Sequence, residues 1–255
     1  MELAILDLET TGVSPEQGRI VEIAIVRTRG LTEVSRWSSL VRSDVPVGAS
    51  ERIHHLSDAM LAEAPTLAAL RDEIGARLEG ATLVAHRAPF DLAFLDAAVA
   101  RGELVSRPAT VIDTAAIAER VLGDSRLSSV ASRVGGRMPS HRALPDALAA
   151  LDALAACVET LGPIDAAELA ELSETRASMR RAVREQLSDA LSRSVALGLV
   201  YRPASGRLQR DVLRVERLSP PYVTGMFEKR GLRKDLRGDR ILRAFDGEPP
   251  DLRFL

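Results

Sequence analysis

The stretch Ala4–Gly12 constrains the fold of this chain more than any other, because it predicts a short buried strand that ends in two carboxylates and a tight turn. Ile5, Asp7 and Glu9 occupy alternate positions, and side chains alternate between the two faces of a strand. Asp7 and Glu9 therefore project to the same side. Adjacent carboxylates repel each other, which favours a bound cation between them, and Mg²⁺ and Mn²⁺ prefer oxygen ligands. A solvated turn carrying two free acids is the alternative.

The composition is that of a globular protein. The chain has 255 residues, enough for one large or two small domains, and its apolar fraction is 46%. Cys157 is the single cysteine, which excludes an internal disulfide, argues against zinc and favours the reducing cytoplasm. We expect neither a signal peptide nor a membrane span, because no basic segment precedes an apolar run and no apolar run is long enough to cross a bilayer.

Charge is distributed unevenly, although the formal net charge is only −2. Residues 1–175 contain 16 Lys and Arg against 26 Asp and Glu, whereas residues 176–255 contain 18 against 10. This asymmetry of charge predicts two units with different functions. The basic unit either meets phosphates or packs on the acidic one.

Residues 1–162 predict a mixed sheet with helices on its faces, an α/β domain. Three strands in succession, the first at Ala4–Gly12 and the next two at Arg19–Val26 and Val34–Val41, predict an antiparallel meander. Ser57 is a predicted N-cap, and Pro65 and Pro145 are predicted to lie at helix starts. The remaining predicted elements are strands at Thr82–His86 and Thr110–Asp113 and helices at Ser57–Leu61, Pro65–Gly80, from Pro89, up to Leu122, Leu127–Val134 and up to Leu161.

Residues 163–255 predict a different organisation. Gly162-Pro163 interrupts the chain, and residues 163–197 predict a helical linker, with Ala166–Leu197 largely helical. Residues 198–255 predict a small β-rich module. Its expected strands are Leu197–Tyr201, Arg210–Glu216, Tyr222–Phe227 and Asp239–Ala244.

Two further acids fall where the first pair can reach them. Asp91 lies in the first turn of the helix after Thr82–His86, and Asp146 lies in the first turn of the helix after a Gly-Gly loop. Sites in α/β domains collect at strand ends and helix starts. His141 lies on the loop five residues before Asp146, where an imidazole can act as general base on a water.

The order Asp7-x-Glu9, His86-x-Ala88-x-Phe90-Asp91 and His141-x4-Asp146 resembles the three motifs of the DEDDh exonucleases. These belong to the ribonuclease H-like superfamily and include the proofreading subunit of bacterial DNA polymerase III. The resemblance covers roughly residues 1–162. Further matching segments are Leu6–Gly12, Ile20–Ala24, Ile53–Asp58 and Asp113-Thr114.

The resemblance implies a two-metal mechanism. Asp7, Glu9, Asp91 and Asp146 would hold two Mg²⁺ or Mn²⁺ ions, and His141 would take the proton of the attacking water. Glu9 would also touch the terminal 3′-OH. The implied product is a 5′-mononucleotide released from a 3′ end.

Three residues near these motifs are predicted to contact the substrate. Thr10 and Thr11 follow the acids and would place backbone N–H groups near the terminal nucleotide. The family usually has Asn at the position of Arg87. An arginine there either binds a substrate phosphate, which we prefer, or pairs with Asp91 and weakens metal binding.

Several other conspicuous residues are expected to be structural. Asp113 ends a strand and is expected to cap the following helix. The histidines outside the motif core are expected at helix starts, loops or strand ends, and the aromatic residues are expected to pack. These residues are His54, His55, His86, Phe90, Phe94 and Trp37.

The C-terminal module resembles a WYL domain, a small β-rich module of bacterial regulators and DNA-repair proteins thought to bind nucleic acid or nucleotides. The tripeptide that names that domain is replaced by Tyr222-Val223-Thr224. The implied role is substrate capture or regulation, with Tyr201 or Tyr222 stacking a base and cationic side chains meeting phosphates. A basic, solvated face docked on the acidic domain is the alternative. The cationic residues are Arg233, Lys234, Arg237 and Arg240.

Together these features predict a metal-dependent 3′→5′ exonuclease acting on single-stranded DNA ends, with nucleic acid as its partner. Exoribonuclease action on short RNA stays open, because a contact to a 2′-OH is not visible in the sequence. A nucleic-acid sensor with residual catalysis is a third possibility, which Arg87 favours and the intact acids oppose.

Overall fold

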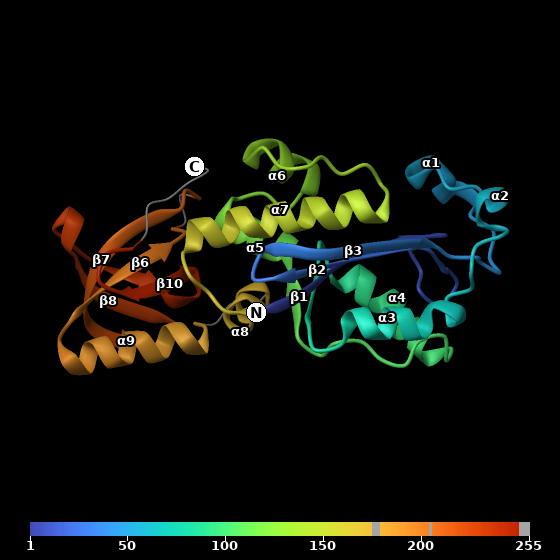
Figure 1. Cartoon of the computed structure of the whole chain (residues 1–255). Coiled ribbons are helices and arrows are strands. Elements are labelled where there is room, and N and C mark those ends of the chain that lie inside the picture. The colour runs from blue at the N-terminus through green and yellow to red at the C-terminus, as the bar shows by residue number, and fades with distance from the viewer. Residues whose placement is uncertain (175–178, 204–205, 250–255) are drawn as a thin grey trace. The chain divides into compact units, whose positions relative to one another are not determined.

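The computed structural model describes residues 1–174, 179–203 and 206–249 (Figure 1). The chain divides into two compact units. The first comprises Met1–Ala115 and Arg126–Ala155, and the second comprises Ala116–Ser125 and Ala156–Leu255. This division places 116–125 with the C-terminal residues, whereas the sequence predicted one boundary near residue 162.

The first unit contains a five-stranded sheet with the order β3-β2-β1-β4-β5. β1 (Glu2–Thr10) pairs in antiparallel fashion with β2 (Ile20–Arg29), which pairs likewise with β3 (Thr32–Leu40). β1 is parallel to β4 (Thr82–Ala85), and β4 is parallel to β5 (Val111–Asp113). The predicted mixed sheet and its antiparallel meander are therefore confirmed.

Helices cover both faces of this sheet (Figure 1). α3 and α4 lie on one face, where Ile74 and Phe94 pack with Leu6 and Leu8 of β1 in one core. α7 runs along the other face. Because Leu6 and Leu8 face α3 and α4, Asp7 turns to the opposite side of β1. The helices are α1 (Glu51–His54), α2 (Asp58–Leu61), α3 (Arg71–Leu78), α4 (Pro89–Ala100), α5 (Thr114–Val121), α6 (Leu127–Val134) and α7 (Ala143–Leu161).

Most predicted helix starts are confirmed, with one shift. Ser57 caps α2 through its side chain, as predicted. The helix predicted from Pro65 begins only at Arg71, after a short 3₁₀ turn. Within this stretch the Thr66 hydroxyl accepts a hydrogen bond from the Ala69 N–H at 3.2 Å. Such a side-chain bond offers the backbone an alternative to the α-helix and delays its start.

The second unit contains a five-stranded antiparallel sheet with the order β10-β6-β7-β8-β9. β9 was not predicted as a strand, because its sequence Leu-Arg-Lys-Asp-Leu-Arg is mostly charged and the strand lies at an edge of the sheet. The strand predicted at Asp239–Ala244 begins two residues later. The strands are β6 (Ala196–Tyr201), β7 (Gln209–Ser219), β8 (Tyr222–Phe227), β9 (Leu232–Arg237) and β10 (Ile241–Asp246).

Two helices precede these strands, namely α8 (Ala166–Ser173) and α9 (Arg181–Arg193). Val183 and Leu187 of α9 join Leu199 and Phe227 in the core of the second unit. α9 therefore packs on the sheet as part of the module, whereas the sequence predicted that residues 163–197 form a linker. Residues 175–178 of that prediction, and residues 204–205 and 250–255 of the predicted module, lie outside the described residues.

No single helix in the described part of the chain is long and apolar enough to cross a membrane; only α7 and α8 taken together, as a bent pair, have that length and composition.

Candidate active site

Three of the predicted acids converge at the end of β1. One carboxylate oxygen each from Asp7, Glu9 and Asp146 lies within 4.8 Å of the others. β1 supplies the first two from alternate positions, and the first turn of α7 supplies Asp146 from the adjacent face of the sheet. Three oxygen ligands at this spacing fit a hard divalent cation.

Asp91 completes the predicted set of four acids. It is 3% exposed and lies in the first turn of α4, which begins at Pro89 directly after β4. Because β4 is parallel to β1 and next to it, α4 starts at the same edge of the sheet as the end of β1. The charge of Asp91 acts on Asp7, whose pKa it raises, so the two carboxyls belong to one electrostatic cluster.

Burial raises the pKa of all four carboxyls, and repulsion by neighbouring carboxylates adds to this for Asp7, Glu9 and Asp91. The pKa of Asp7 lies well above its usual range, because of burial first and then the charges of Asp91, Asp146 and Glu9. Burial, with Asp146 nearby, raises the pKa of Glu9 to about 8. Burial also raises the pKa of Asp91 and of Asp146. A bound divalent cation would favour the ionised carboxylates and offset their repulsion, so these four acids suit a cation site.

His141 lies at the surface, on the loop before α7. Its backbone adopts a left-handed conformation with φ of 56°. The backbone N–H of the preceding residue, Ser140, donates to Asp146 at 2.7 Å, and the charge of His141 lowers the pKa of that carboxyl. An exposed imidazole beside the acids suits a general base that must reach a water.

Two charged residues of this site, Glu22 and Arg142, were not predicted from the sequence. Glu22 of β2, which is opposite Glu9 in the strand register, is 5% exposed. Its carboxylate accepts two hydrogen bonds from Arg142, at 3.0 and 2.7 Å, and a third from the Ala143 N–H at 2.9 Å. A glutamate between Val21 and Ile23 in an apolar strand was the available signal, because buried glutamates are nearly always paired.

The predicted substrate contacts differ in availability. The Thr11 N–H donates to the Arg19 carbonyl at 2.9 Å, and the Thr10 hydroxyl donates to the Gly12 carbonyl at 2.7 Å. The Thr11 amide predicted to face a nucleotide is thus used within the turn. Arg87 is exposed, and no ion pair between it and Asp91 occurs among the described residues.

Arg87 also has a left-handed backbone, with φ of 63°. The side chain of Asp113 accepts hydrogen bonds from the N–H groups of Arg87, at 2.9 Å, and Ala115, at 3.0 Å. Asp113 therefore caps the start of α5, as predicted, and also fixes the loop that carries Arg87.

The other conspicuous residues are mostly structural, as expected. His86 contacts the Thr114 hydroxyl at 2.9 Å, and Trp37 packs against the core. His54 lies at the end of α1 and is 1% exposed. Phe94 is fully buried, whereas Phe90 is 38% exposed, which contradicts its predicted place in the core.

The cationic residues predicted in the second unit do not form one cluster. Arg233 and Arg237 occupy alternate positions on one face of β9 and pair with Glu216 and Asp239. Lys234 turns to the other face, where its ammonium lies 5.0 Å from the centre of the Phe227 ring. Arg240 lies in a half-buried 3₁₀ turn before β10.

The aromatic prediction for this unit is wrong for one residue. Tyr201 is fully buried and its hydroxyl donates to Gln209 at 2.9 Å, so it cannot stack a base. Tyr222 is 46% exposed and stays available.

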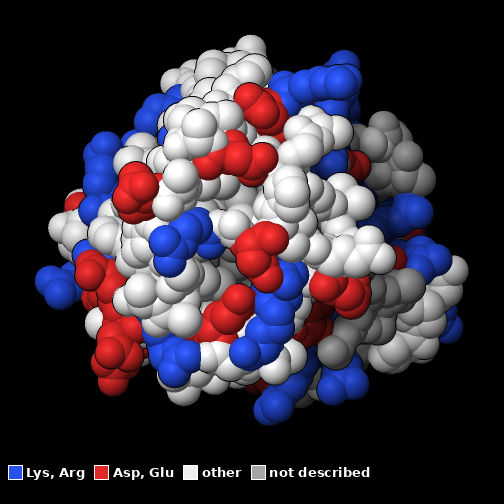
Figure 2. All heavy atoms as spheres, turned by 90° about the vertical axis from the view of Figure 1, so that its right-hand side faces the viewer, with Lys and Arg blue, Asp and Glu red and all other residues white. Residues whose placement is uncertain are grey.

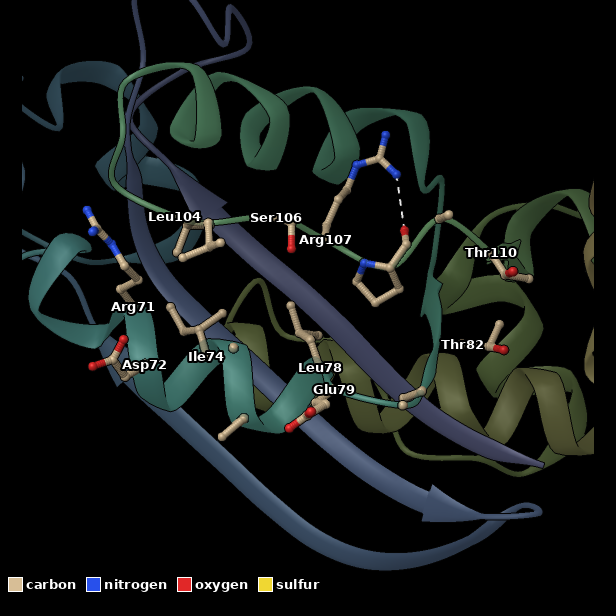
Figure 3. Close-up of a pocket in the computed structure, with 17 residues that line it drawn as sticks. Arg71, Asp72, Ile74, Leu78, Glu79, Thr82, Leu104, Ser106, Arg107 and Thr110 are labelled. Carbon is tan, nitrogen blue, oxygen red and sulfur yellow. Dashed lines mark hydrogen bonds between the residues drawn. The ribbon is translucent and has the colours of Figure 1, made fainter.

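A separate cavity of about 760 Å³ lies between α3 and the segment 104–110 (Figure 3). Its lining includes Thr82 and Thr110, at the starts of β4 and β5. The acids lie at the opposite ends of these parallel strands, so this cavity is not the acidic site. Figure 2 views the side on which α1 and α2 lie in Figure 1 and shows acidic and basic side chains interspersed there.

Comparison with known proteins identifies the first unit. A family model described as Exonuclease (RNase_T) matches residues 4–154. The chain belongs to this exonuclease family. It is 34% identical over 149 residues to the DNA polymerase III subunit epsilon of Treponema pallidum, covering 55% of this chain and 69% of that protein. It is 36% identical over 168 residues, or 60% of this chain, to a DNA polymerase III subunit epsilon-like protein of Rhodobacter capsulatus. It covers only 23% of the length of that protein.

Solved structures agree with this assignment. Exonuclease X, in complex with 5′ overhanging duplex DNA, matches with a TM-score of 0.55 and 29% identity over 68% of this chain and 99% of that one. The nuclease domain of 3′hExo, a DEDDh family member bound to rAMP, shares the fold with a TM-score of 0.52 and 16% identity, over 60% and 89% of the chains. The predicted DEDDh-type exonuclease fold is thus confirmed for this exonuclease unit.

Proposed function

We propose that this protein is a metal-dependent 3′→5′ exonuclease that releases 5′-mononucleotides from single-stranded DNA ends. The observation that carries the proposal is the convergence of Asp7, Glu9 and Asp146 within 4.8 Å, with Asp91 buried beside them. Their raised pKa values mean that the fold without a bound cation disfavours the ionised form of each of these acids. The family match over residues 4–154 supports an exonuclease rather than another use of such a cluster.

Two Mg²⁺ or Mn²⁺ ions would be held by the four carboxylates, since such cations prefer oxygen ligands. Such ions supply Lewis-acid activation of a water and charge stabilisation of the leaving 3′ oxygen. The residues of the chain have two roles: the carboxylates bind the cations, and His141 moves a proton. His141 accepts the proton of the attacking water, and its position at the surface leaves it open to solvent for proton release.

Exposed apolar side chains flank the site residues in sequence and suit unpaired bases. Val13 follows the Thr10–Gly12 turn and is 87% exposed. Phe90 precedes Asp91 and is 38% exposed, and Met138 lies three residues before His141 and is 55% exposed. The Phe90 ring can stack on a base of any sequence, Val13 and Met138 can pack against one, and the faces of bases are accessible only where strands are unpaired. This supports single-stranded ends as substrate.

We propose that the second unit contains a WYL-like module that binds nucleic acid or regulates the enzyme. Support comes from the exposed face of β8 and β9, where Tyr222 is paired in register with Arg237 and Met226 with Arg233. The Arg233–Glu216 pair is exposed and therefore weak, and the Arg237 side chain is 38% exposed in its pair with Asp239, so phosphates can compete for both arginines.

The decisive experiment is digestion of 3′ ends in labelled single-stranded DNA and matched RNA, with Mg²⁺ or Mn²⁺, by the native protein and by Asp7→Ala. A metal-dependent ladder from the 3′ end that disappears in the variant is expected. The ratio of DNA to RNA cleavage decides between the deoxyribonuclease and the exoribonuclease. Tight binding without a ladder in either metal would refute the catalytic proposal and favour a nucleic-acid sensor.

The module is tested in the full chain with Arg233→Ala combined with Arg237→Ala. Losing two phosphate contacts should raise KM for single-stranded DNA and make its dependence on salt less steep, by about 1.4 in the log–log slope. Arg193→Ala, which removes an exposed arginine that pairs with Asp189 on α9, is the matched control. Equal effects of both changes would argue against a specific role of the β9 face. The cytoplasmic location stays a prediction, which imaging of the tagged protein tests.

A further inference from the structure

Glu22 is a buried acid that the two-metal mechanism does not use. It lies opposite Glu9 in the register of β1 and β2, and its charge acts on Asp7 and Glu9. A fifth carboxylate beside four others adds repulsion unless it is neutralised. The guanidinium of Arg142 supplies that neutralisation through a bidentate pair across 120 residues of sequence.

The donors to Glu22 come from the two residues that follow His141. Arg142 contributes its side chain, and Ala143 contributes the backbone N–H at the first position of α7. On the other side of His141, the Ser140 N–H donates to Asp146 at 2.7 Å. His141 therefore lies between two neighbours that are each tied to a carboxylate.

The backbone of His141 needs such support. Its φ of 56° lies in the left-handed region, which costs a residue with a Cβ atom about 1–2 kcal/mol. A strained conformation of this kind persists only where the surrounding structure enforces it. The Glu22 carboxylate, held in the sheet and accepting three hydrogen bonds, supplies that enforcement on the C-terminal side of His141.

We propose that Glu22 is a positioning residue of the exonuclease, which through Arg142 and Ala143 holds the His141 imidazole where it reaches the attacking water. This inference rests on the proposed function only for the role of His141. The contact between Glu22 and the start of α7 exists whether or not the chain is catalytic.

The test uses Glu22→Gln, which keeps the shape of the side chain but loses its charge and one acceptor. Because a displacement of about 1 Å at a catalytic group costs up to about 100-fold, kcat on single-stranded DNA should fall about 10- to 100-fold. KM and the metal concentration for half-maximal activity should change less than about threefold, since Glu22 touches neither substrate nor cation in this proposal.

The chain offers a control of matched chemistry. Asp152 of α7 accepts two hydrogen bonds from the Arg137 side chain, at 2.8 and 2.5 Å, and one from the Arg137 N–H at 2.8 Å. These hydrogen bonds hold the same loop at Arg137, four residues before His141. Asp152→Asn should lower kcat less than about threefold. Equal losses in the two variants would show general loop stability and overturn the proposal.

A double-mutant cycle separates positioning from mere destabilisation. In a His141→Ala background, Glu22→Gln should lower the residual kcat by less than about twofold, because its effect acts through the missing imidazole. A further tenfold loss in that background would refute the proposal.

Amide hydrogen exchange tests the contact without activity. Glu22→Gln should speed exchange of the Ala143 amide at least about tenfold, whereas Asp152→Asn should leave it unchanged. If the wild type cleaves nothing but Glu22→Gln still speeds exchange of the Ala143 amide, the exonuclease is rejected while the support of the His141 backbone by Glu22 stands. Unchanged exchange in an active enzyme would reject the positioning role and keep the exonuclease.

Discussion

Replacing Glu9 by Gln should stabilise the metal-free protein at pH 8 and not at pH 5. Burial and the nearby Asp146 raise the pKa of Glu9 from 4.5 to about 8 in the folded state. Below about pH 4.5 the carboxyl is protonated whether folded or unfolded, so it has no effect. Between about pH 4.5 and 8 the folded state holds a proton that the unfolded state has released, so stability falls as pH rises.

The size of the effect follows from the same shift. At 1.36 kcal/mol for each pKa unit, the rise corresponds to about 5 kcal/mol of destabilisation once the carboxyl ionises in both states. Glu9 is only partly buried, and solvent screening reduces this figure to about 2–3 kcal/mol. Glu9→Gln removes the ionisation and should recover about that amount at pH 8, but less than about 0.5 kcal/mol at pH 5.

Urea unfolding in EDTA, followed by fluorescence, measures this directly. Trp37 is the single tryptophan and lies on β3 in the exonuclease unit, so its signal reports the unit that contains Glu9. Excess Mn²⁺ should stabilise the wild type more than Glu9→Gln, because the variant has lost a ligand. Glu33→Gln, on an exposed pair of the same strand as Trp37, is the control and should show no such pH dependence. An equal advantage of Glu9→Gln at both pH values, or a less stable variant at pH 8, would refute the reasoning.

Three further predictions concern single residues. Arg87→Asn should raise the free energy of unfolding by about 0.5–1 kcal/mol, because Asn tolerates the left-handed φ of 63°. It should also raise KM if the guanidinium binds a phosphate. Urea unfolding and steady-state kinetics measure the two effects, and a loss of stability would contradict the first. Gly225→Ala should destabilise the second unit by about 2 kcal/mol or more, because a Cβ atom would lie 2.3 Å from the Arg214 carbonyl oxygen; a thermal melt with no change would contradict this. Cys157, whose pKa burial raises to about 12, should resist iodoacetamide at pH 8 until the protein unfolds, and rapid labelling in native buffer would contradict its burial.

Local sequence patterns determined the exonuclease fold and its acids. Asp7 and Glu9 alternate along one strand, and Asp91 and Asp146 each lie in the first turn of a helix that follows a strand or loop. These relations span a few residues and are fixed by the backbone geometry of strands and helices, so no tertiary contact is needed to infer them. The same holds for Ser57, whose cap bonds a backbone N–H within its own helix.

Tertiary packing determines which charged and aromatic side chains are exposed and available for a ligand. Tyr201 and Tyr222 both lie on strands of one sheet, but the first is turned into the core against α9 and the second faces outward. Arg233 and Lys234 are neighbours in sequence and point to opposite faces of β9. In a strand at a sheet edge with a mostly charged sequence, the alternation of apolar and polar residues is too weak to predict which side chains face the core.

The support of the His141 backbone is the clearest case. Glu22 and Arg142 are separated by 120 residues, and nothing in the sequence around either one indicates the other. Their pairing arises because β2 is next to β1 in the sheet and α7 begins beside both strands. Local periodicity therefore places the four acids and His141 at strand ends and helix starts, and the motif resemblance is what proposes them as ligands and base. How the segment that carries His141 is held follows from the fold, because such contacts depend on which distant elements become neighbours.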